Sequence, residues 1–356
     1  MSMQFSHAVG YRGIASIGKC STSGGVDTIS ESELTTILCT GGNLSFNQDP
    51  IMSGGVWGAG YSNAAPIAYA FNYLSMEGSV NFEWVLKSNI SNDTNDDKVW
   101  EALKSFAITN RTTKAGIKLL PDGSNGFLGG GWCSSLSFEA SEGAALTGSF
   151  NFKGDPSAQT TGNNNNSSII VGKEPSDQVE STPSKSKGNW SSSSKPNSSG
   201  IVGAVLVPYW QTSVYWFTPN TSTFEIPDSV PPNATQLSNH STDVINWSCS
   251  YNSDLQVLKC CNYQSTPPIA PDYILCGEMS GEASVTTFNK SGISVNSGFH
   301  EQQGIAFYIG KYRRVVLPLV LCSSKSTSMA TGSSYLTCDM SYTALGNGYD
   351  SILSMN

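Results

Sequence analysis

The chain has 356 residues with a formal net charge of −8, and charged residues make up only 13% of it. The acidic balance excludes a sequence-wide basic surface for gripping nucleic acid. The low charge, together with abundant Ser, Thr, Asn and Gly, favours a β-rich protein with polar strand faces over a helical enzyme. The length is sufficient for two domains that each bury a core.

The N-terminus and the apolar runs predict a protein that is made and folded in a cytoplasm. Residues 1–10 lack the basic start and the apolar run of a secretory signal. The longest apolar run, residues 315–322, contains Pro318 and is far too short to span a membrane. No membrane is therefore expected among the partners.

The nine cysteines are expected to be reduced and mostly buried, because no secretory route is predicted. Cys260 and Cys261 are the candidates for oxidation after release from a cell. The sequence has no C-x-x-C motif, and its three histidines lie far from any cysteine pair. No metal site and no cofactor is therefore predicted.

Two parts of the chain show the same order of features. Each has a strand with one cysteine, Cys39 or Cys249, then a long polar segment with Pro, then a second strand marked by Met, Glu, Gly and Ser. The first copy covers residues 34–49 and 71–84, and the second covers residues 243–254 and 273–288. The repeat predicts that the chain contains two copies of one domain.

The polar segment of each copy is a candidate arm that packs on a neighbouring subunit. Residues 48–66 carry scattered apolar side chains that would be a liability on an isolated domain. The arm candidates in the two segments are Met52, Val56, Trp57, Tyr61, Cys260, Cys261 and Tyr263. The alternative for residues 48–66 is an Ω-loop folded on its own domain.

One helix is predicted, over residues 95–107. Residues 92–97 supply N-cap candidates and acidic groups for the first turn. Apolar side chains at helical spacing share one face, and they are Val99, Trp100, Leu103, Phe106 and Ala107. This face is expected to cover one open side of a β-sandwich. The second copy has no good counterpart.

The predicted fold class is mainly β, with two tandem β-sandwich domains. The first domain covers residues 1–154, and the second covers residues 201–356. Between them, residues 155–200 are too poor in apolar side chains to fold alone. This segment is either a linker that wraps an assembly or an inert surface insertion.

The sequence offers little for catalysis, and no enzyme is predicted. It contains no Walker loop, no G-x-G-x-x-G between a strand and a helix, and no G-x-S-x-G elbow. Glu77 and Glu83 share one face of a strand, and nothing divides them into an acid and a base. The basic cluster Lys311, Arg313 and Arg314 suits a solvated edge or a salt bridge, with a phosphate contact as the alternative.

The order of these elements and two short strings resemble the tail tube proteins of long-tailed bacteriophages, in their duplicated-domain form. The strings are C-S-S-L-S-F at residues 133–138 and L-T-G-S-F-N-F-K at residues 146–153. Both look like the closing strands of that family. The resemblance covers residues 34–154 best and residues 243–345 more loosely.

The resemblance implies a structural protein of the virion tail that assembles in the host cytoplasm. Family members fold as a β-sandwich with a flanking helix and a long loop that reaches a neighbouring subunit. Six such domains form a ring around a DNA channel and rings stack into a tube, so three two-domain chains would form one ring. The partners implied are further copies, other tail proteins, and genomic DNA that passes without specific binding. Glu77 and Glu83 are candidates for acids facing the lumen.

A second interpretation also makes the chain a virion protein but gives it a different role. A β-sandwich virion protein could instead decorate the head or bind a receptor or a glycan. A glycan-binding module would need a concave aromatic patch, for which the candidates are Tyr209, Trp210, Tyr215 and Trp216.

Overall fold

The structure is a computed structural model. It describes residues 14–23, 26–29, 34–47, 50–52, 69–71, 75–86, 98–109, 114–121, 126–154, 159–161, 169–170, 205–237, 243–258, 273–289, 301–328, 336–346 and 352–355. Of the predicted segment 155–200, these ranges include only β13 (Gln159–Thr161) and β14 (Ile169–Ile170).

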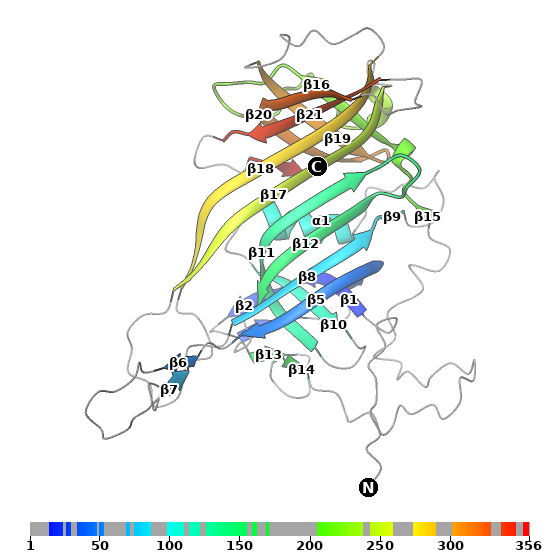
Figure 1. Ribbon diagram of the computed structural model, residues 1–356. Helices are drawn as coiled ribbons and strands as arrows, with labels where there is room; N and C mark the ends of the chain where they lie inside the picture. Colours follow the sequence, from blue (N-terminus) through cyan, green and yellow to red (C-terminus); the bar gives the residue numbers. More distant parts are fainter. Residues whose placement is uncertain are drawn as a thin grey trace, which may run out of the picture.

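The described part of the chain is mainly β, as the sequence predicts (Figure 1). The first strand set consists of β1 (Ile14–Lys19), β5 (Cys39–Asn47), β8 (Ser75–Glu83), β10 (Ala115–Leu120), β11 (Gly126–Ala140) and β12 (Thr147–Gly154). The second strand set consists of β16 (Thr212–Phe217), β17 (Val244–Leu258), β18 (Tyr273–Asn289), β19 (Gln302–Ile309), β20 (Arg313–Ser328) and β21 (Leu336–Ala344). Short strands are β2 (Ser21–Ser23), β3 (Val26–Thr28), β4 (Thr35–Thr36), β6 (Pro50–Met52), β7 (Tyr69–Phe71), β9 (Val85–Leu86), β15 (Val205–Leu206) and β22 (Ser354–Met355).

The two strand sets pair in the same order. In the first set the hydrogen-bonded neighbours run β1–β10–β11–β12–β8–β5, and in the second they run β16–β19–β20–β21–β18–β17. All of these pairs are antiparallel. The short strands β14 and β22 also take matching places, on β11 and β20.

The registers of the two sets match at single residues as well. The pairing of β11 with β12 shifts between Cys133 and Ser135, and the pairing of β20 with β21 shifts between Cys322 and Ser324. At each β-bulge the thiol donates to the carbonyl of the residue two positions on, at 3.5 Å and 3.4 Å. A bulge inserts one residue and re-aims the strand, so both sets bend at the same point.

One continuous sheet joins the two sets. Residues 135–140 of β11 pair with residues 247–252 of β17 in an antiparallel ladder, which places Phe138 opposite Cys249. Six strands therefore lie side by side across the front of the molecule, in the order β5, β8, β12, β11, β17 and β18 (Figure 1). The two strand sets are therefore parts of one sheet, because the seam between β11 and β17 is an ordinary antiparallel ladder.

The core lies where the sheet folds back at β11. The first half of β11 pairs with β10, and its second half pairs with β12. The two layers meet at Gly131, where an added Cβ would lie 2.7 Å from Ile117 of β10 and 3.0 Å from Phe152 of β12. Glycine here allows the close approach.

The predicted helix is present and covers this core. It comprises α1 (Lys98–Lys104) and a π-helical turn, η3 (Ser105–Thr109), and it packs behind the sheet (Figure 1). Of the predicted face, Trp100, Leu103, Phe106 and Ala107 are buried, while Val99 is half-buried against the core. Edge-to-face contacts join Trp100 to Trp84 at 5.6 Å and Phe106 to Phe150 at 5.7 Å between ring centroids.

The second strand set has a different cover on part of its back face. Residues 218–237 form a loop with a 3-10 turn at Ala234–Gln236. Its Val230 and Leu237 pack with Phe217 of β16, Tyr308 of β19 and other side chains in a separate apolar cluster. No helix of the described residues is both long and apolar enough to span a membrane.

Candidate functional site

The front face of the continuous sheet is polar because buried apolar and outward polar residues alternate along its strands between the β-bulges. In β8, Met76, Gly78, Val80 and Phe82 are buried, and the residues between them face the other way. This period of two is a property of the extended backbone. The residues facing front on β8 are Ser75, Glu77, Ser79, Asn81 and Glu83, so the two predicted lumen acids lie on one face as expected.

The cross-strand registers extend this polar face over the neighbouring strands. On the first strand set it continues through Asn43, Ser45, Asn47, Ser135, Ser137, Glu139, Thr147, Ser149, Asn151 and Lys153. On the second it continues through Asn246, Ser248, Ser250, Asn252, Ser280, Glu282, Ser284, Thr286, Ser324, Ser326, Ser328, Thr337, Asp339, Ser341 and Thr343. We call this surface the polar face.

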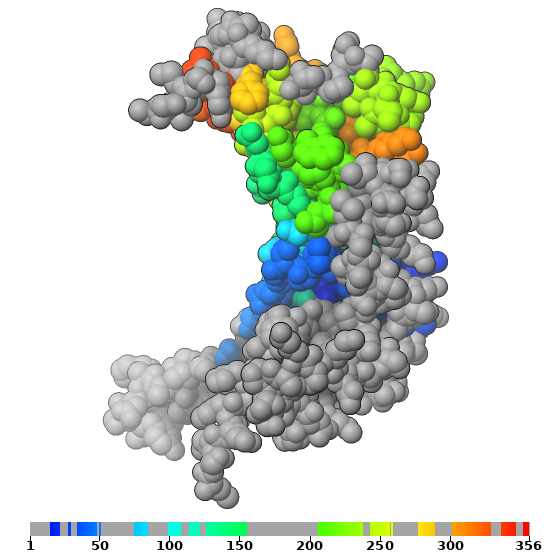
Figure 2. Space-filling view, turned by 90° about the vertical axis from the view of Figure 1, so that its right-hand side faces the viewer, coloured from blue at the N-terminus to red at the C-terminus, as the bar shows by residue number. Residues whose placement is uncertain are grey.

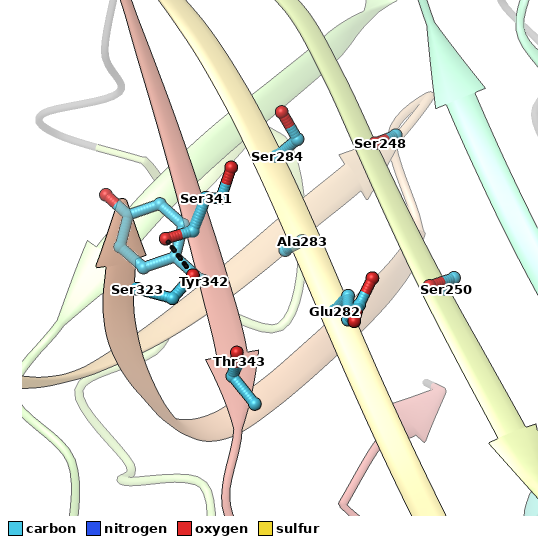
Figure 3. Close-up of a pocket in the computed structure, with 9 residues that line it drawn as sticks. All are labelled: Ser248, Ser250, Glu282, Ala283, Ser284, Ser323, Ser341, Tyr342 and Thr343. Carbon is cyan, nitrogen blue, oxygen red and sulfur yellow. Dashed lines mark hydrogen bonds between the residues drawn. The ribbon is translucent and has the colours of Figure 1, made fainter. Parts of the chain in front are cut away.

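The polar face is concave. Figure 2 shows the molecule from the side, with the coloured surface hollowed between β5 and β8 below and β18 and β21 above. Within it is a shallow depression that Glu282, Ser284, Ser341 and Thr343 help to line. In Figure 3 the side chains of β17, β18 and β21 form a patch of hydroxyl groups around the Glu282 carboxylate.

The charges on the polar face are acidic, and its only cation is neutralised. The acidic side chains are Glu77, Glu83, Glu139, Glu282 and Asp339, against the single cation Lys153. Lys153 Nζ lies 3.7 Å from Glu77 Oε1 and donates to the Leu255 carbonyl at 3.0 Å. Thr286 donates to Asp339 Oδ1 at 2.7 Å, which holds that carboxylate on the sheet. No described cation is left to bind phosphate on this face.

Hydroxyl and amide groups hold one another across the strands. Ser137 and Ser149 share a hydrogen bond of 2.8 Å, and Asn151 donates to Ser135 Oγ at 2.6 Å. Groups that are paired in this way are less available to a passing ligand. The face is therefore suited to sliding contact rather than to specific binding.

The basic cluster has a structural role that the sequence did not indicate. Arg314 donates through one guanidinium nitrogen to the carbonyl oxygens of Val230 and Pro231, at 3.1 Å and 2.7 Å. Arg313 is buried, and Lys311 lies 4.7 Å above the ring of Tyr312. The prediction of a solvated edge or a salt bridge is wrong for Arg314, because its partners are backbone carbonyls of the loop 218–237.

The aromatic candidates for a glycan site do not form one patch. Trp210 is 63% exposed. Tyr209 and Trp216 pack against the main core, and Tyr215 packs against the cluster under the loop 218–237. Three of the four rings are partly buried against two different clusters, so together they do not form the single stacking platform that a sugar would need.

The arm candidates are mostly beyond the structural description. Met52 ends β6 and pairs with Tyr69 of β7. Val56, Trp57, Tyr61, Cys260, Cys261 and Tyr263 lie outside the described residues. Their role stays a prediction.

Burial makes five of the described thiols poor nucleophiles. The free cysteines Cys39, Cys133, Cys249, Cys322 and Cys338 all have a raised pKa, and burial is the main cause in each. Burial raises the pKa of the Cys249 thiol from its ordinary 9.0 to about 12, and it raises the pKa of Cys133 as well. Among the described residues, no group of three or more His, Cys, Asp or Glu could hold a metal ion.

Comparison with known proteins finds likenesses among solved structures. No family model and no curated protein matches the chain. One similar solved structure is a virion of a native gene transfer agent particle, with 12% identity and a TM-score of 0.25 over 33% of this chain and 88% of that chain. Another is the SPP1 tail tube, with 14% identity and a TM-score of 0.21 over 39% of this chain and 79% of that chain.

The second of these structures is a tail tube, the class of protein that residues 133–153 resemble in sequence. Both TM-scores are below 0.5, so neither likeness shows what this chain does.

Proposed function

We propose that this chain is a structural virion protein whose copies join into rings, and that the rings stack into a tail tube with a channel for DNA. Three copies would form one ring, and the polar face of each copy would line the lumen. The protein has no catalytic role in this proposal and needs no cofactor. It assembles in the host cytoplasm, with other tail proteins at the ends of the tube.

The observation that carries the proposal is the concave polar face. A channel for DNA must not hold phosphates, because strong cationic contacts would stall the duplex. Acidic side chains repel phosphates over about 10 Å at 0.1 M salt. Hydroxyl and amide groups keep the wall wet without adding a charge. The face meets these requirements, since its one lysine is paired with Glu77.

The matching strand sets support a ring built from duplicated units. We propose that residues 1–154 and residues 201–356 are two copies of one domain, each supplying one sixth of the ring. Glu77 on β8 and Glu282 on β18 take equivalent places in the two registers. A ring of three chains would then carry an acid at every equivalent position of one level. The cross-strand neighbour of the acid would alternate around the ring, because Lys153 lies opposite Glu77 and Thr343 lies opposite Glu282.

The segments at 48–66 and 260–271 remain the proposed arms between subunits. Both follow strands at the same end of the polar face, because β5 and β17 take equivalent places. The candidates Met52, Trp57 and Tyr263 would then pack on the neighbouring ring or subunit. The insertion at 155–200 would lie outside the tube or at a ring junction.

Electron microscopy of the purified protein tests the proposal directly. Class averages should show rings or tubes with a threefold or pseudo-sixfold repeat and an open centre. Only isolated particles, at concentrations up to the millimolar range, would rule the tube out. Binding to emptied capsids without rings would identify a head decoration protein instead, and glycan binding without rings would identify a receptor-binding module.

A further inference from the structure

Two strand edges at opposite ends of the continuous sheet have no partner within the described residues. β5 pairs only with β8, and residues 322–328 of β20 pair only with β21. β5 has nine residues without a charge or a proline, and its Phe46 is 42% exposed. A long uncharged edge is normally protected, because it otherwise pairs with another chain.

The chain already contains one seam between strands of the same two kinds. β11 of the first set pairs with β17 of the second over residues 135–140 and 247–252. In the matching strand orders, β20 takes the place of β11 and β5 takes the place of β17. In this seam β11 and β17 pair through the edges that correspond to the unpaired edges of β20 and β5. The unpaired edges of β20 and β5 could therefore form the same kind of ladder, but they lie at opposite ends of one molecule.

We propose that β20 of one copy pairs antiparallel with β5 of the next copy, in the register of the internal seam. This inference rests on the proposed ring and names its interface. The two strand sets can be aligned at their β-bulges and at the equivalent acids Glu77 and Glu282. In this alignment Ser324 corresponds to Ser135, and Asn47 corresponds to Asn252. The partners across the seam are then Ser324 with Asn47, Lys325 with Phe46, Ser326 with Ser45, Thr327 with Leu44, and Ser328 with Asn43.

This register continues the two faces of the sheet across the seam. The serines of β20 and the polar residues of β5 meet on the concave side, so the polar face is unbroken. On the back, the aliphatic stem of Lys325 covers the exposed ring of Phe46. The equivalent pair inside the chain is Leu136 and Tyr251, whose side chains are 2% and 0% exposed. The seam between copies is thus the more polar of the two, and it is the one at which a ring would open.

Engineered cysteines test the register. Ser45→Cys together with Ser326→Cys places two thiols on directly opposed, exposed positions, where Cβ atoms lie about 4.5–5.5 Å apart and closer in pairs without hydrogen bonds. Mild oxidation should link copies through disulfides, which need a Cβ separation of about 3.5–4.5 Å. The matched control is Asn47→Cys with Ser328→Cys, which the register separates by four residues, or roughly 14 Å along the strand. Wild type and single variants treated alike report the background from the native thiols.

The expected result is a ladder of linked copies that ends at three, seen only for Ser45→Cys with Ser326→Cys on a non-reducing gel. Rings in electron micrographs without this cross-link would overturn the seam and leave the tube proposal standing. Cross-linking of the control pair instead would show a slipped register and overturn the proposed one. A ladder that continues past three would confirm the seam and contradict the ring of three. Absence of both rings and cross-links would overturn seam and function together.

Discussion

At the scale of single residues, Phe46 connects the folded chain to its proposed assembly. Its ring is 42% exposed at the end of an edge strand, although a phenylalanine gains most when it is fully covered. The sequence placed Phe46 in a strand, but it did not show that the strand is an edge. That fact comes from the strand pairing, in which β5 has β8 as its one partner among the described residues.

Replacing Phe46 should change assembly much more than stability. Phe46→Lys would set two ammonium groups against each other at the seam with Lys325, at a cost of roughly 0.2–1 kcal/mol for each seam. Rings should become rarer in electron micrographs, while the melting temperature of the isolated chain stays within a few degrees. The matched variant Phe46→Glu loses the same aromatic side chain but places a carboxylate opposite Lys325, so it should retain assembly. Equal assembly of both variants would contradict the pairing with Lys325.

Buried thiols make the fold sensitive to alkali. Cys249 has a pKa of about 12 when folded and 9.0 when unfolded, because burial disfavours the thiolate. The unfolded chain therefore binds fewer protons between these values, so stability is complete below pH 9 and falls as pH rises toward 12. The slope is at most about 1.4 kcal/mol per pH unit from this thiol.

Urea unfolding at pH 8 and pH 11 measures this effect. Cys249→Ala should be less stable than wild type at pH 8, because a small cavity is created, and should lose less stability on going to pH 11. Parallel loss in both proteins would show that other groups, such as Tyr342 with its pKa raised by burial to about 12, dominate the alkaline limb.

At the scale of elements, the helix was the most predictable feature. Apolar spacing of 3.6 predicted residues 95–107, and the structure has helical turns over residues 98–109. Of the predicted start, residues 95–97 lie outside the description. The strands of the polar face were also predictable in type, because alternation is a local property. Their neighbours were not, since the partner of a strand is chosen by distant residues.

Removing one aromatic side chain from the helix should destabilise the first strand set. Phe106 is buried against Phe150 of β12, with ring centroids 5.7 Å apart. Phe106→Ala should lower the free energy of unfolding by about 3–5 kcal/mol through lost burial and a cavity. Glu101→Ala, at an exposed site of the same helix, should stay within about 0.5 kcal/mol of wild type. Denaturant melts of both variants would decide, and equal midpoints would show that the helix does not cover the core.

At the scale of the whole molecule, the charge of the concave side is the feature on which the proposed function depends. Net charge predicted an acidic protein but not where the acids lie. Ser, Thr and Asn on alternating positions were a signal for the polar face, and Glu139 and Asp339 could have been added to the predicted acids from the same alternation. The sequence could not show that these strands lie in one sheet.

Under the proposed function, lysines added to the polar face should turn a wall that does not bind DNA into one that does. Ser79→Lys with Ser284→Lys places one cation at equivalent positions of β8 and β18. Assembled protein should then retain duplex DNA in gel-shift assays, and retention should fall steeply with salt. Wild type should retain none. Thr218→Lys with Thr221→Lys adds the same charge on the exposed loop 218–237 and should bind far less. Equal retention by both variants would contradict a lumen lined by the polar face.

By itself the sequence determined the β class, the helix and the side of each strand that is polar, because each follows from a local period in the chain. It also predicted a repeat, from the order of features that two parts of the chain share. Only the tertiary structure decided that β11 and β17 close a seam, that the polar sides share one concave surface, and that β5 and part of β20 keep an open edge in the described chain. The reason is that strand pairing joins residues more than one hundred positions apart, and long-range packing and twist select those partners.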